Sequence, residues 1–450
     1  MDTYRGTLMC WALMWGTSTW ASAAAAEPVD TGQGTTWAVH AERRIDVGDG
    51  SVQRDVVVAV RDGRIHALYA AGKVPADLAV RELGAVTLLP GLIDAHTHLT
   101  GDPKIGTWET LGRSEANDAI TGVANALATV RAGFTTVREL GAYNHSSSAL
   151  RDAIDRGEVP GPRIRSAGIW IGMRGGHCDT NLLAPQYAHY DAGIADGPWA
   201  VRAMVREMAK YGADLVKFCA SGGVTTVGNE PGTQQYTAEE MDALVDEAHR
   251  LGMKVAAHAH GAEAIKTAIR AGVDSVEHAS LIDEEGLRLA KQRGTWLVMD
   301  VYNGDYIEEV GSKEGWLAEI LRKNRETTDV QREGFRRAVR LGVPLAFGTD
   351  AGIYPHGDNA IQFGYMVRFG MTPVQAIRSA TLDAARLLGV DAETGSIEVG
   401  KAADLIAVAG DPLQDIALLR HPRLVVARGR IVRDELRTPS LPSPYVAPAQ

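Results

Sequence analysis

Apolar, strand-like segments alternate with amphipathic helical segments through the middle of the 450-residue chain. Six times a helical pattern, such as AEEMDALVDEAHR, ends close to a glycine, and an apolar segment follows. Glycine commonly ends a helix because it adopts a positive φ without strain from a Cβ atom. Strands that alternate with helices predict parallel βαβ units. The turn glycines are Gly133, Gly212, Gly252, Gly272, Gly294 and Gly342.

Two further apolar segments, LLPGLIDAHTHL and PRIRSAGIW, lack the glycine signal and bring the number of predicted strands to eight. Eight βα units over about 300 residues indicate a (β/α)8 TIM barrel, an α/β fold. A doubly wound open sheet is the alternative, but no GxGxxG phosphate loop follows the first strand. The predicted strands are 88–99, 135–140, 163–170, 214–220, 254–260, 275–280, 295–300 and 344–350.

The two ends of the chain have a different pattern from its middle. Residues 35–87 and 395–432 both indicate short antiparallel strands, the first with an RDGR turn. Ends of matching character on either side of a barrel predict one β-sandwich formed from both termini. The expected division is a signal peptide at 1–26, sandwich at 27–88, barrel at 89–390, sandwich at 391–440 and a Pro-rich tail at 441–450.

Polar residues end the predicted barrel strands in a regular register. Glu139, His258, His278 and Asp300 each lie six positions after a turn glycine, Lys217 lies five positions after one, and Asp350 lies eight. Ionisable residues are therefore expected at the C-terminal ends of the strands. This is the face of a TIM barrel where active sites lie.

The first predicted strand ends in DAHTHL, with His96 and His98 two positions apart. Side chains on a strand alternate between its two faces, so both imidazoles lie on the same face. In a closed barrel this face can be the one that points into the interior. Lys217 lies among apolar neighbours in DLVKFC. One interpretation is that its amine extends to solvent or pairs with a carboxylate. The other is that the amine is neutral often enough to react with CO2 and form a carbamate that bridges two cations.

His258 and His278 end successive strands and are candidate ligands for a metal such as zinc, although each alone is also compatible with a structural core histidine. Asp350 in FGTDAG either caps the following segment or serves as a carboxylate that binds metal and moves a proton. Four histidines, one lysine and one aspartate converge on one face from five strands. This set predicts two metal ions and a bridging hydroxide, because metal binding lowers the pKa of water to about 7.

The formal net charge of −10 argues against nucleic acid or an anionic membrane as the main partner. Residues 1–26 contain the apolar run LMCWALMW and end in ASAAAA, which predicts a cleaved signal peptide and a secreted or periplasmic protein. A tag-like N-terminus is the alternative, and the run is too short to favour a membrane span. After cleavage Cys178 and Cys219 remain, either as one disulfide or as two free or metal-proximal thiols.

The motifs PGLIDAHTHL, VKFCASGG, VEHASLID, FGTDAG and GSIEVGKAADLIAV resemble those of the amidohydrolase superfamily. TTVRELG, LRDAIDRGEVPGPRI and RGGHCD are similar to its Xaa-Pro dipeptidase (prolidase) and imidazolonepropionase-like branch, which includes secreted ochratoxin-degrading enzymes. The resemblance implies that the protein binds two divalent metal ions, with zinc as the expected metal. It also implies a homo-oligomer. The implied metal ligands are His96, His98 and Asp350 for one ion, His258 and His278 for the other, and carboxylated Lys217 as the bridge.

The resemblance also implies contacts to the substrate. The histidine of the GGH loop, here His177, is expected to bind the α-carboxylate of the substrate, with help from Arg174 and His260. Arg174 is also compatible with a solvated loop residue. Relatives often have tyrosine where this chain has His260, so either histidine of HAH could bind the metal. His258 fits the register, and His260 is expected nearer to solvent.

The predicted function is a binuclear metal-dependent amidohydrolase of the carboxypeptidase or dipeptidase type. Its substrates are expected to be small molecules or dipeptides with a free carboxylate, including ochratoxin A, which would yield ochratoxin alpha and phenylalanine. The bridging hydroxide attacks the amide carbonyl, and Asp350 moves the proton to the leaving amine. A lactonase or organophosphate hydrolase is the alternative. A non-catalytic scaffold is disfavoured because none of the implied ligands is missing.

Overall fold

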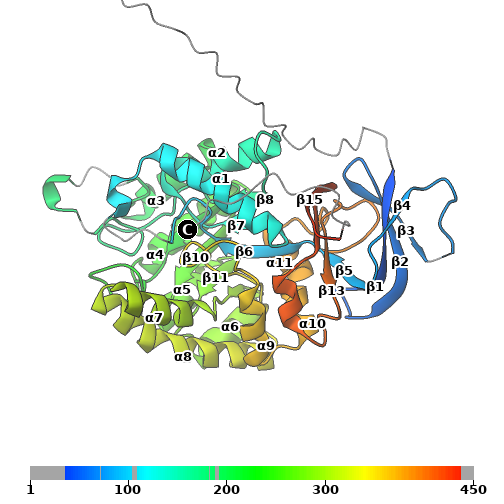
Figure 1. Ribbon diagram of the computed structural model, residues 1–450. Helices are drawn as coiled ribbons and strands as arrows, with labels where there is room; N and C mark the ends of the chain where they lie inside the picture. The colour runs from blue at the N-terminus through cyan, green and yellow to red at the C-terminus, as the bar shows by residue number, and fades with distance from the viewer. Residues whose placement is uncertain (1–35, 71, 104–108, 182, 188–191, 437–450) are drawn as a thin grey trace, which may run out of the picture.

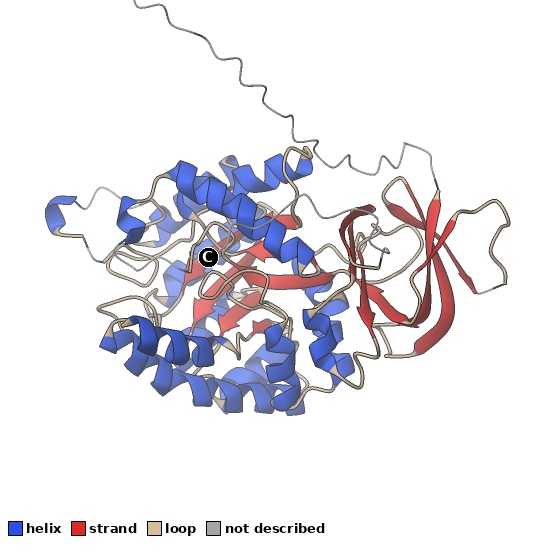
Figure 2. Cartoon of the chain, viewed as in Figure 1, coloured by secondary structure: helices blue, strands red, loops and turns tan. Residues whose placement is uncertain are grey.

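A computed structural model shows a helix-covered barrel and a separate β-sheet domain beside it (Figures 1 and 2). The predicted signal peptide and the Pro-rich tail lie outside the described residues, so both stay predictions. Among the helices described, none has the length and apolar character needed to cross a bilayer. The structure describes residues 36–70, 72–103, 109–181, 183–187 and 192–436.

Seven parallel strands and one irregular segment form the barrel, which confirms the predicted (β/α)8 fold. The pairs run in chain order, β6 to β7 to β8 and β9 to β10 to β11 to β12. A bridge between Ile171 and Phe218 connects β8 to β9. The strands are β6 (Leu92–Thr97), β7 (Phe134–Glu139), β8 (Arg163–Ser166), β9 (Leu215–Cys219), β10 (Lys254–Ala259), β11 (Ser275–His278) and β12 (Trp296–Val298).

The predicted eighth strand at 344–350 is wrong in detail, because this segment closes the barrel without forming a regular strand. It has only isolated bridges, Leu345 to Leu297 and Ala351 to Thr97. Pro344 has no N–H to donate to a ladder. At the other end of the segment, the N–H of Thr349 donates to the Asp94 side chain at 3.1 Å. The predicted third and seventh strands are likewise shorter than expected.

The helices surround the barrel, and each turn glycine has the positive φ that the sequence predicts, from +65° at Gly342 to +99° at Gly272. Short 3₁₀ turns lie at Glu109–Gly112, Tyr143–His145, Pro185–Tyr187 and Ile416–Arg420. The helices are α1 (Glu115–Arg131), α2 (Ser146–Asp155), α3 (Pro198–Lys210), α4 (Ala238–Arg250), α5 (Ala262–Ala271), α6 (Glu284–Arg293), α7 (Asn303–Glu314), α8 (Ala318–Leu341), α9 (Ile361–Arg368), α10 (Pro373–Ser379) and α11 (Leu382–Leu388).

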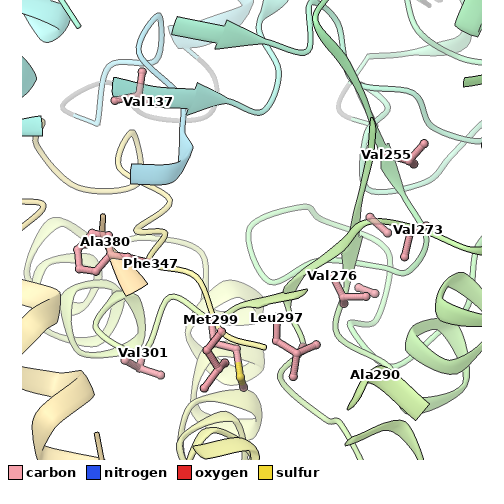
Figure 3. Packing of buried hydrophobic residues seen from close by; sticks show 14 of the residues in the cluster. Val137, Val255, Val273, Val276, Ala290, Leu297, Met299, Val301, Phe347 and Ala380 are labelled. Atoms are coloured by element: carbon pink, nitrogen blue, oxygen red, sulfur yellow. The ribbon is translucent and has the colours of Figure 1, made fainter. Parts of the chain in front are cut away.

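The main hydrophobic core lies between the barrel strands and the helices (Figure 3). Val255, Val276 and Leu297, on three successive strands, are completely buried and belong to one cluster with Ala290 of α6. Burial of a valine or leucine side chain contributes roughly 1.5–3 kcal/mol. This core holds the strands in place, so side chains at their C-terminal ends have a rigid support.

Strands from both ends of the chain form one sheet domain, as predicted. The eight-stranded sheet has the order β15-β14-β13-β5-β1-β2-β3, with β4 paired to β1. β5 is antiparallel to β13, with Pro90 opposite Leu405, and β5 leads directly into barrel strand β6. The strands are β1 (Trp37–Ile45), β2 (Val52–Arg61), β3 (Arg64–Ala70), β4 (Val80–Glu82), β5 (Val86–Pro90), β13 (Leu405–Ala409), β14 (Leu424–Ala427) and β15 (Arg430–Asp434).

Candidate metal centre

His96, His98 and Asp350 meet where β6 approaches the closing segment of the barrel. Asp350 Oδ1 lies 3.3 Å from His96 Nε2 and 3.2 Å from His98 Nε2. The backbone N–H of Asp350 donates to the His96 carbonyl at 2.8 Å, which fixes the two segments relative to each other. The three side chains therefore present one potential ligand atom each to a common point, in a group able to hold a metal ion.

The other ring nitrogens of this histidine pair are occupied, and this determines which nitrogen is free for a metal. His98 Nδ1 lies 3.0 Å from the Gly141 carbonyl, which can only accept, so Nδ1 carries the proton. His96 Nδ1 lies 3.1 Å from Glu277 Oε2, an ion-pair contact in which neither atom has hydrogen-bond geometry. In both rings the Nε2 lone pair is left toward Asp350. Ligand histidines are usually oriented by such contacts.

His258, His260 and His278 form a second group able to hold a metal ion. His258 Nε2 donates to the Gly222 carbonyl at 3.2 Å, so its free lone pair is on Nδ1. His278 Nδ1 donates to Asp300 Oδ1 at 3.0 Å, which leaves Nε2 free. His260 Nδ1 lies 2.7 Å from the Ser280 hydroxyl. Each imidazole therefore has one nitrogen held by the protein and one remaining for a ligand.

The expectation that His260 lies nearer to solvent than His258 is wrong. The exposed fractions are 5% for His260 and 4% for His258. The loop after β9 covers the end of β10 so closely that a Cβ atom at Gly261 would lie 2.2 Å from the Gly232 carbonyl oxygen. Burial lowers the pKa of both imidazoles well below the ordinary value, so both are neutral, as metal ligands must be.

Lys217 is the central residue of β9 and is 4% exposed. Burial lowers the pKa of Lys217 to about 8, although the nearby Glu277 and Asp350 carboxylates act in the opposite direction. Among the described residues, no hydrogen bond is found at its Nζ atom. A buried amine without a bonded partner is costly while it is charged. The environment of Lys217 therefore increases the fraction of neutral amine compared with an ordinary lysine, and the neutral amine is the form that reacts with CO2.

Two of the candidate ligands adopt an unusual backbone conformation. His278 has φ +67° and Asp350 has φ +58°, both in the left-handed region. Residues other than glycine rarely adopt this region, although histidine and aspartate do so more often than most. Such strain is concentrated at functional sites, where the surrounding structure keeps it in place. At His278 strand β11 ends, and at Asp350 the irregular closing segment of the barrel ends, and at both positions the chain turns so that the side chain faces the centre.

A carboxylate that was noted at a strand end but not assigned to the metal site, Asp300, lies at the junction of the two groups. It forms a third potential metal-binding group with His278 and Asp350. Asn303 Nδ2 and Gln331 Nε2 donate to Asp300 at 2.7 and 2.9 Å. The sequence had one signal for Asp300, its position six residues after the turn glycine Gly294, where other barrel strands also end in a polar residue. Its amide partners come from α7 and α8, where no pattern indicated them.

Replacing Asp300 with alanine is expected to weaken metal binding by about 10- to 100-fold, because the His278 ring would lose the acceptor that orients it. Metal affinity is measured by competition with a chelator of known affinity. Asp329→Ala is the matched control, because the Asp329 side chain is 94% exposed on α8. Equal affinity in the Asp300 and Asp329 variants would show that Asp300 does not orient the ligand.

A buried ion pair supports the centre from within the barrel. Arg138 Nη2 donates to Glu277 Oε1 at 2.8 Å, and its other nitrogens bond Ser275 and the Ala95 carbonyl. Although burial opposes it, Arg138 and His96 lower the pKa of Glu277 to about 2. Glu277 is therefore ionised and available to orient His96. Neither residue was identified from the sequence, because Glu277 precedes a more conspicuous histidine and Arg138 precedes Glu139.

The two loop residues predicted to contact substrate, His177 and Arg174, lie in different environments. The His177 ring packs against the His258 ring with centroids 4.1 Å apart, so this loop histidine reaches the centre. Arg174 is largely exposed and its Nε lies 3.4 Å from Asp196 Oδ2. Among the described contacts, none joins Arg174 to the metal-binding groups. Its guanidinium is near the surface carboxylate of Asp196, and its contact with substrate stays a prediction.

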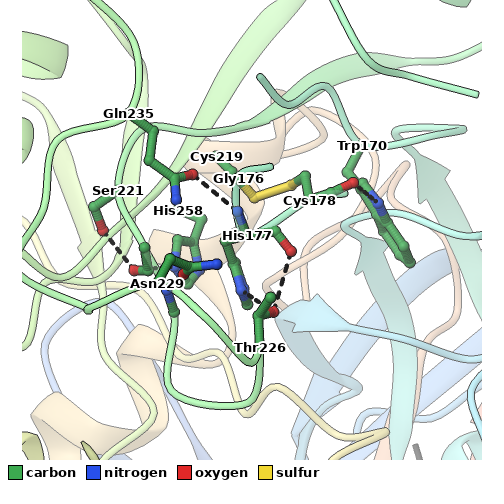
Figure 4. Close-up of a disulfide and its surroundings, with 12 residues drawn as sticks. Trp170, Gly176, His177, Cys178, Cys219, Ser221, Thr226, Asn229, Gln235 and His258 are labelled. Carbon is green, nitrogen blue, oxygen red and sulfur yellow. Dashed lines mark hydrogen bonds between the residues drawn. A yellow bond between two sulfur atoms is a disulfide. The ribbon is translucent and has the colours of Figure 1, made fainter. Parts of the chain in front are cut away.

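Cys178 and Cys219 form a disulfide, which decides between the two states that the sequence left open (Figure 4). Cys219 is the last residue of β9, and Cys178 directly follows His177. The thiols are therefore unavailable as metal ligands while the bond is intact. The crosslink instead connects the loop after β8 to the strand that contains Lys217.

Comparison with known proteins places this arrangement in a family. Residues 87–432 match the sequence profile of the amidohydrolase family. Ochratoxinase from Aspergillus niger is 32% identical over 403 residues, which cover 84% of this chain and 82% of that protein. Its solved structure superposes with a TM-score of 0.79 at 29% identity, covering 90% of this chain and 96% of that one.

Two other similar proteins have different enzyme names. The solved structure of a Xaa-Pro dipeptidase with methionine bound in its active site is 37% identical, with a TM-score of 0.83, and covers 88% of this chain and 99% of that one. Imidazolonepropionase from Sphingopyxis alaskensis is 26% identical over 80% of this chain and 88% of that protein. The similarity therefore spans both the barrel and most of the sheet domain.

Proposed function

The chain belongs to the amidohydrolase family and is a hydrolase that acts on amide bonds. On that premise we propose that it uses two divalent metal ions to cleave the amide bond to a C-terminal amino acid. The observation that carries this proposal is the convergence of two metal-binding groups, one with His96 and His98 and one with His258 and His278, at the same end of the barrel. Imidazole nitrogen and carboxylate oxygen are donors that suit zinc.

The donor set fits such a pair of ions. When bound, the two ions supply activated water at neutral pH and polarise the substrate carbonyl. As a neutral amine, Lys217 would react with CO2, forming an N–C bond and releasing one proton, and the resulting carbamate would add anionic oxygen donors to the centre. Its buried Nζ and its pKa of about 8 support this role. The other ligands are His96, His98 and Asp350 on one side and His258 and His278 on the other.

Asp350 moves the proton in this proposal. Although burial opposes it, the His96 and His98 imidazoles hold the pKa of Asp350 well below its usual range, so the carboxylate is ionised at neutral pH. It can accept the proton from the attacking water and deliver it to the nitrogen of the leaving amine. Asn303 Nδ2 lies 3.2 Å from Asp350 Oδ2 and helps to orient it.

His177 and His260 bind the carboxylate of the leaving amino acid. Burial and the neighbouring His278 lower the pKa of His177 to about 3, so its ring is neutral and offers a single N–H. The ring lies against His258, next to the second metal-binding group. A neutral N–H donor would bind a carboxylate without adding positive charge to a centre that would hold two cations.

The proposed substrates are N-acyl amino acids and dipeptides with a free carboxylate. Ochratoxin A, split into ochratoxin alpha and phenylalanine, is one instance, supported by the similarity to ochratoxinase and to a Xaa-Pro dipeptidase. We also propose that the protein is secreted or periplasmic. The Cys178–Cys219 disulfide supports this location, because such bonds persist in oxidising compartments.

A combined metal and substrate measurement tests the proposal. Purified protein is expected to contain two divalent ions per chain by elemental analysis, and to hydrolyse members of an N-acyl amino acid library. Each substrate is paired with its C-terminal carboxamide, and kcat/KM is expected to fall by about 10- to 100-fold when the charged hydrogen-bond acceptor is lost. One ion or none would contradict the binuclear centre, and equal rates on both members of a pair would contradict carboxylate recognition.

A further inference from the structure

The disulfide joins the loop after β8 to the barrel next to the proposed metal bridge. Cys219 lies two residues after Lys217, at the end of β9. Cys178 lies in the loop that connects β8 to α3, where the chain forms neither helix nor strand around it. Figure 4 shows the bond between the loop with His177 and the strand with Cys219.

The start of the loop is bonded to β9 through its backbone, because the N–H of Cys219 donates to the Ile171 carbonyl at 2.9 Å and the N–H of Ile171 donates to the Lys217 carbonyl at 2.8 Å. Closer to Cys178 the backbone hydrogen bonds have a different pattern. The N–H of Gly176 donates to Met173 and the N–H of Asp179 donates to Gly176, so both bonds are internal to the loop. The N–H of His177 donates to the Gln235 side chain at 3.0 Å. In residues 173–181 the disulfide is thus the covalent connection to the barrel, and the other described contacts of this segment to the barrel are side-chain hydrogen bonds and packing.

His177 is packed closely as a result. Its Nδ1 lies 2.6 Å from the Thr226 hydroxyl, and its ring lies 4.1 Å from that of His258. A Cβ atom at Gly223 would lie 2.2 Å from the His177 ring. The ring therefore fits between His258 and the loop after β9, and a small displacement of residue 178 would change its position.

The same cysteine also orients an aromatic side chain. Trp170 Nε1 donates to the Cys178 carbonyl at 3.1 Å. The Trp170 ring lies edge-on to His98, with centroids 6.1 Å apart, and contacts Tyr143 at 5.0 Å. Residues next to both histidine groups, His177 beside His258 and Trp170 beside His98, are thus connected to Cys178.

We propose that the Cys178–Cys219 disulfide is a redox-sensitive positioning element that holds His177 and Trp170 beside the two histidine groups. A dithiol reduces it by thiol exchange: the S–S bond breaks, two electrons and two protons pass to the cysteine sulfurs, and the dithiol becomes a disulfide. Cys219 is 2% exposed and Cys178 is half-buried, so the attack occurs at Cys178. The effect on substrate rests on the proposed function.

The metal ligands keep their support when the bond is broken. β9 remains paired to β10, with Lys217 opposite Ala256 and Cys219 opposite His258. β10 in turn is paired to β11, the strand of His278. Reduction is therefore expected to weaken substrate binding and to leave the metal content unchanged. The two readouts distinguish a role of the disulfide in positioning the loop from a role in assembling the metal centre.

The test compares the full-length protein with a Cys178→Ala/Cys219→Ala double variant, each with and without a phosphine reductant. Hydrogen exchange in residues 172–181 is expected to be faster in the double variant and in the reduced wild type, with unchanged metal content. The KM for an N-acyl amino acid is expected to rise about tenfold or more, with kcat within about threefold, because binding loses preorganisation. The double variant is the matched control, since the reductant should not affect it.

Two results would overturn the proposal. Equal exchange and equal KM in wild type and double variant would show that the crosslink positions nothing, and loss of metal together with activity would assign it to the metal frame instead. If the wild type hydrolyses no N-acyl amino acid or dipeptide, the proposed function fails by itself. The exchange measurement still decides on positioning in that case, because it requires no substrate.

Discussion

The Lys217→Ala variant is expected to lose both of its metal ions and its hydrolytic activity down to background. Alanine removes the buried amine, and with it the carbamate that would supply an oxygen to each ion. The remaining histidines would then face two cations with too few anionic ligands. Elemental analysis after dialysis and a hydrolysis assay with a carboxylate-bearing substrate measure both effects.

Two controls separate the carbamate from a general need for lysine. Lys254→Ala removes a lysine from the opposite end of neighbouring strand β10, where Nζ bonds the Leu387 carbonyl, and should keep metal and activity. Adding a small carboxylate such as propionate to Lys217→Ala should restore part of the activity, because the acid can occupy the space left by the side chain. An active, metal-loaded Lys217→Ala protein without additive would remove the carbamate from the mechanism.

The Asp350→Asn variant is expected to keep its metal ions and to lose about 10²- to 10⁴-fold in kcat, the usual contribution of a general acid–base residue. The amide oxygen of asparagine can still contact His96 and His98, but it cannot accept and return a proton at neutral pH. Steady-state kinetics and metal analysis on the same preparation measure the two properties together.

Asp358→Asn is the matched control for this substitution, because Asp358 lies eight residues further along the chain and is exposed. It should behave as wild type in both assays. Near-full turnover by Asp350→Asn would contradict the proton-transfer role. Loss of metal by Asp350→Asn would show instead that its charge is needed mainly to hold the ion beside His96 and His98.

Much of the barrel followed from local signals. The six turn glycines lie where a helix ends and the chain needs a positive φ, and this need depends on only a few neighbouring residues. The segment around Leu345 was the exception, since its apolar pattern predicts a strand. Its bonding depends on Asp94, which is far away in sequence and takes the N–H of Thr349.

The candidate ligands could be predicted for a similar reason. In a parallel barrel every strand ends on the same face, so a polar residue at each strand end is enough to suggest a cluster. No comparable rule predicts the hydrogen bonds that orient the ligands. Asp300 bonds Gln331 from α8, and Glu277 bonds Arg138 from another strand, because folding brings these segments together.

The sequence by itself determined the alternating barrel, the sheet domain from both termini and the set of residues at the strand ends, because each depends on short-range periodicity or on strand direction. Only the tertiary structure decided that His260 is as buried as His258, that Arg174 pairs with Asp196, and that Cys178 bonds Cys219. These features depend on how the loops fold over the ends of the strands. Loop conformation is determined by packing between segments that are distant in the chain, and no local pattern encodes it.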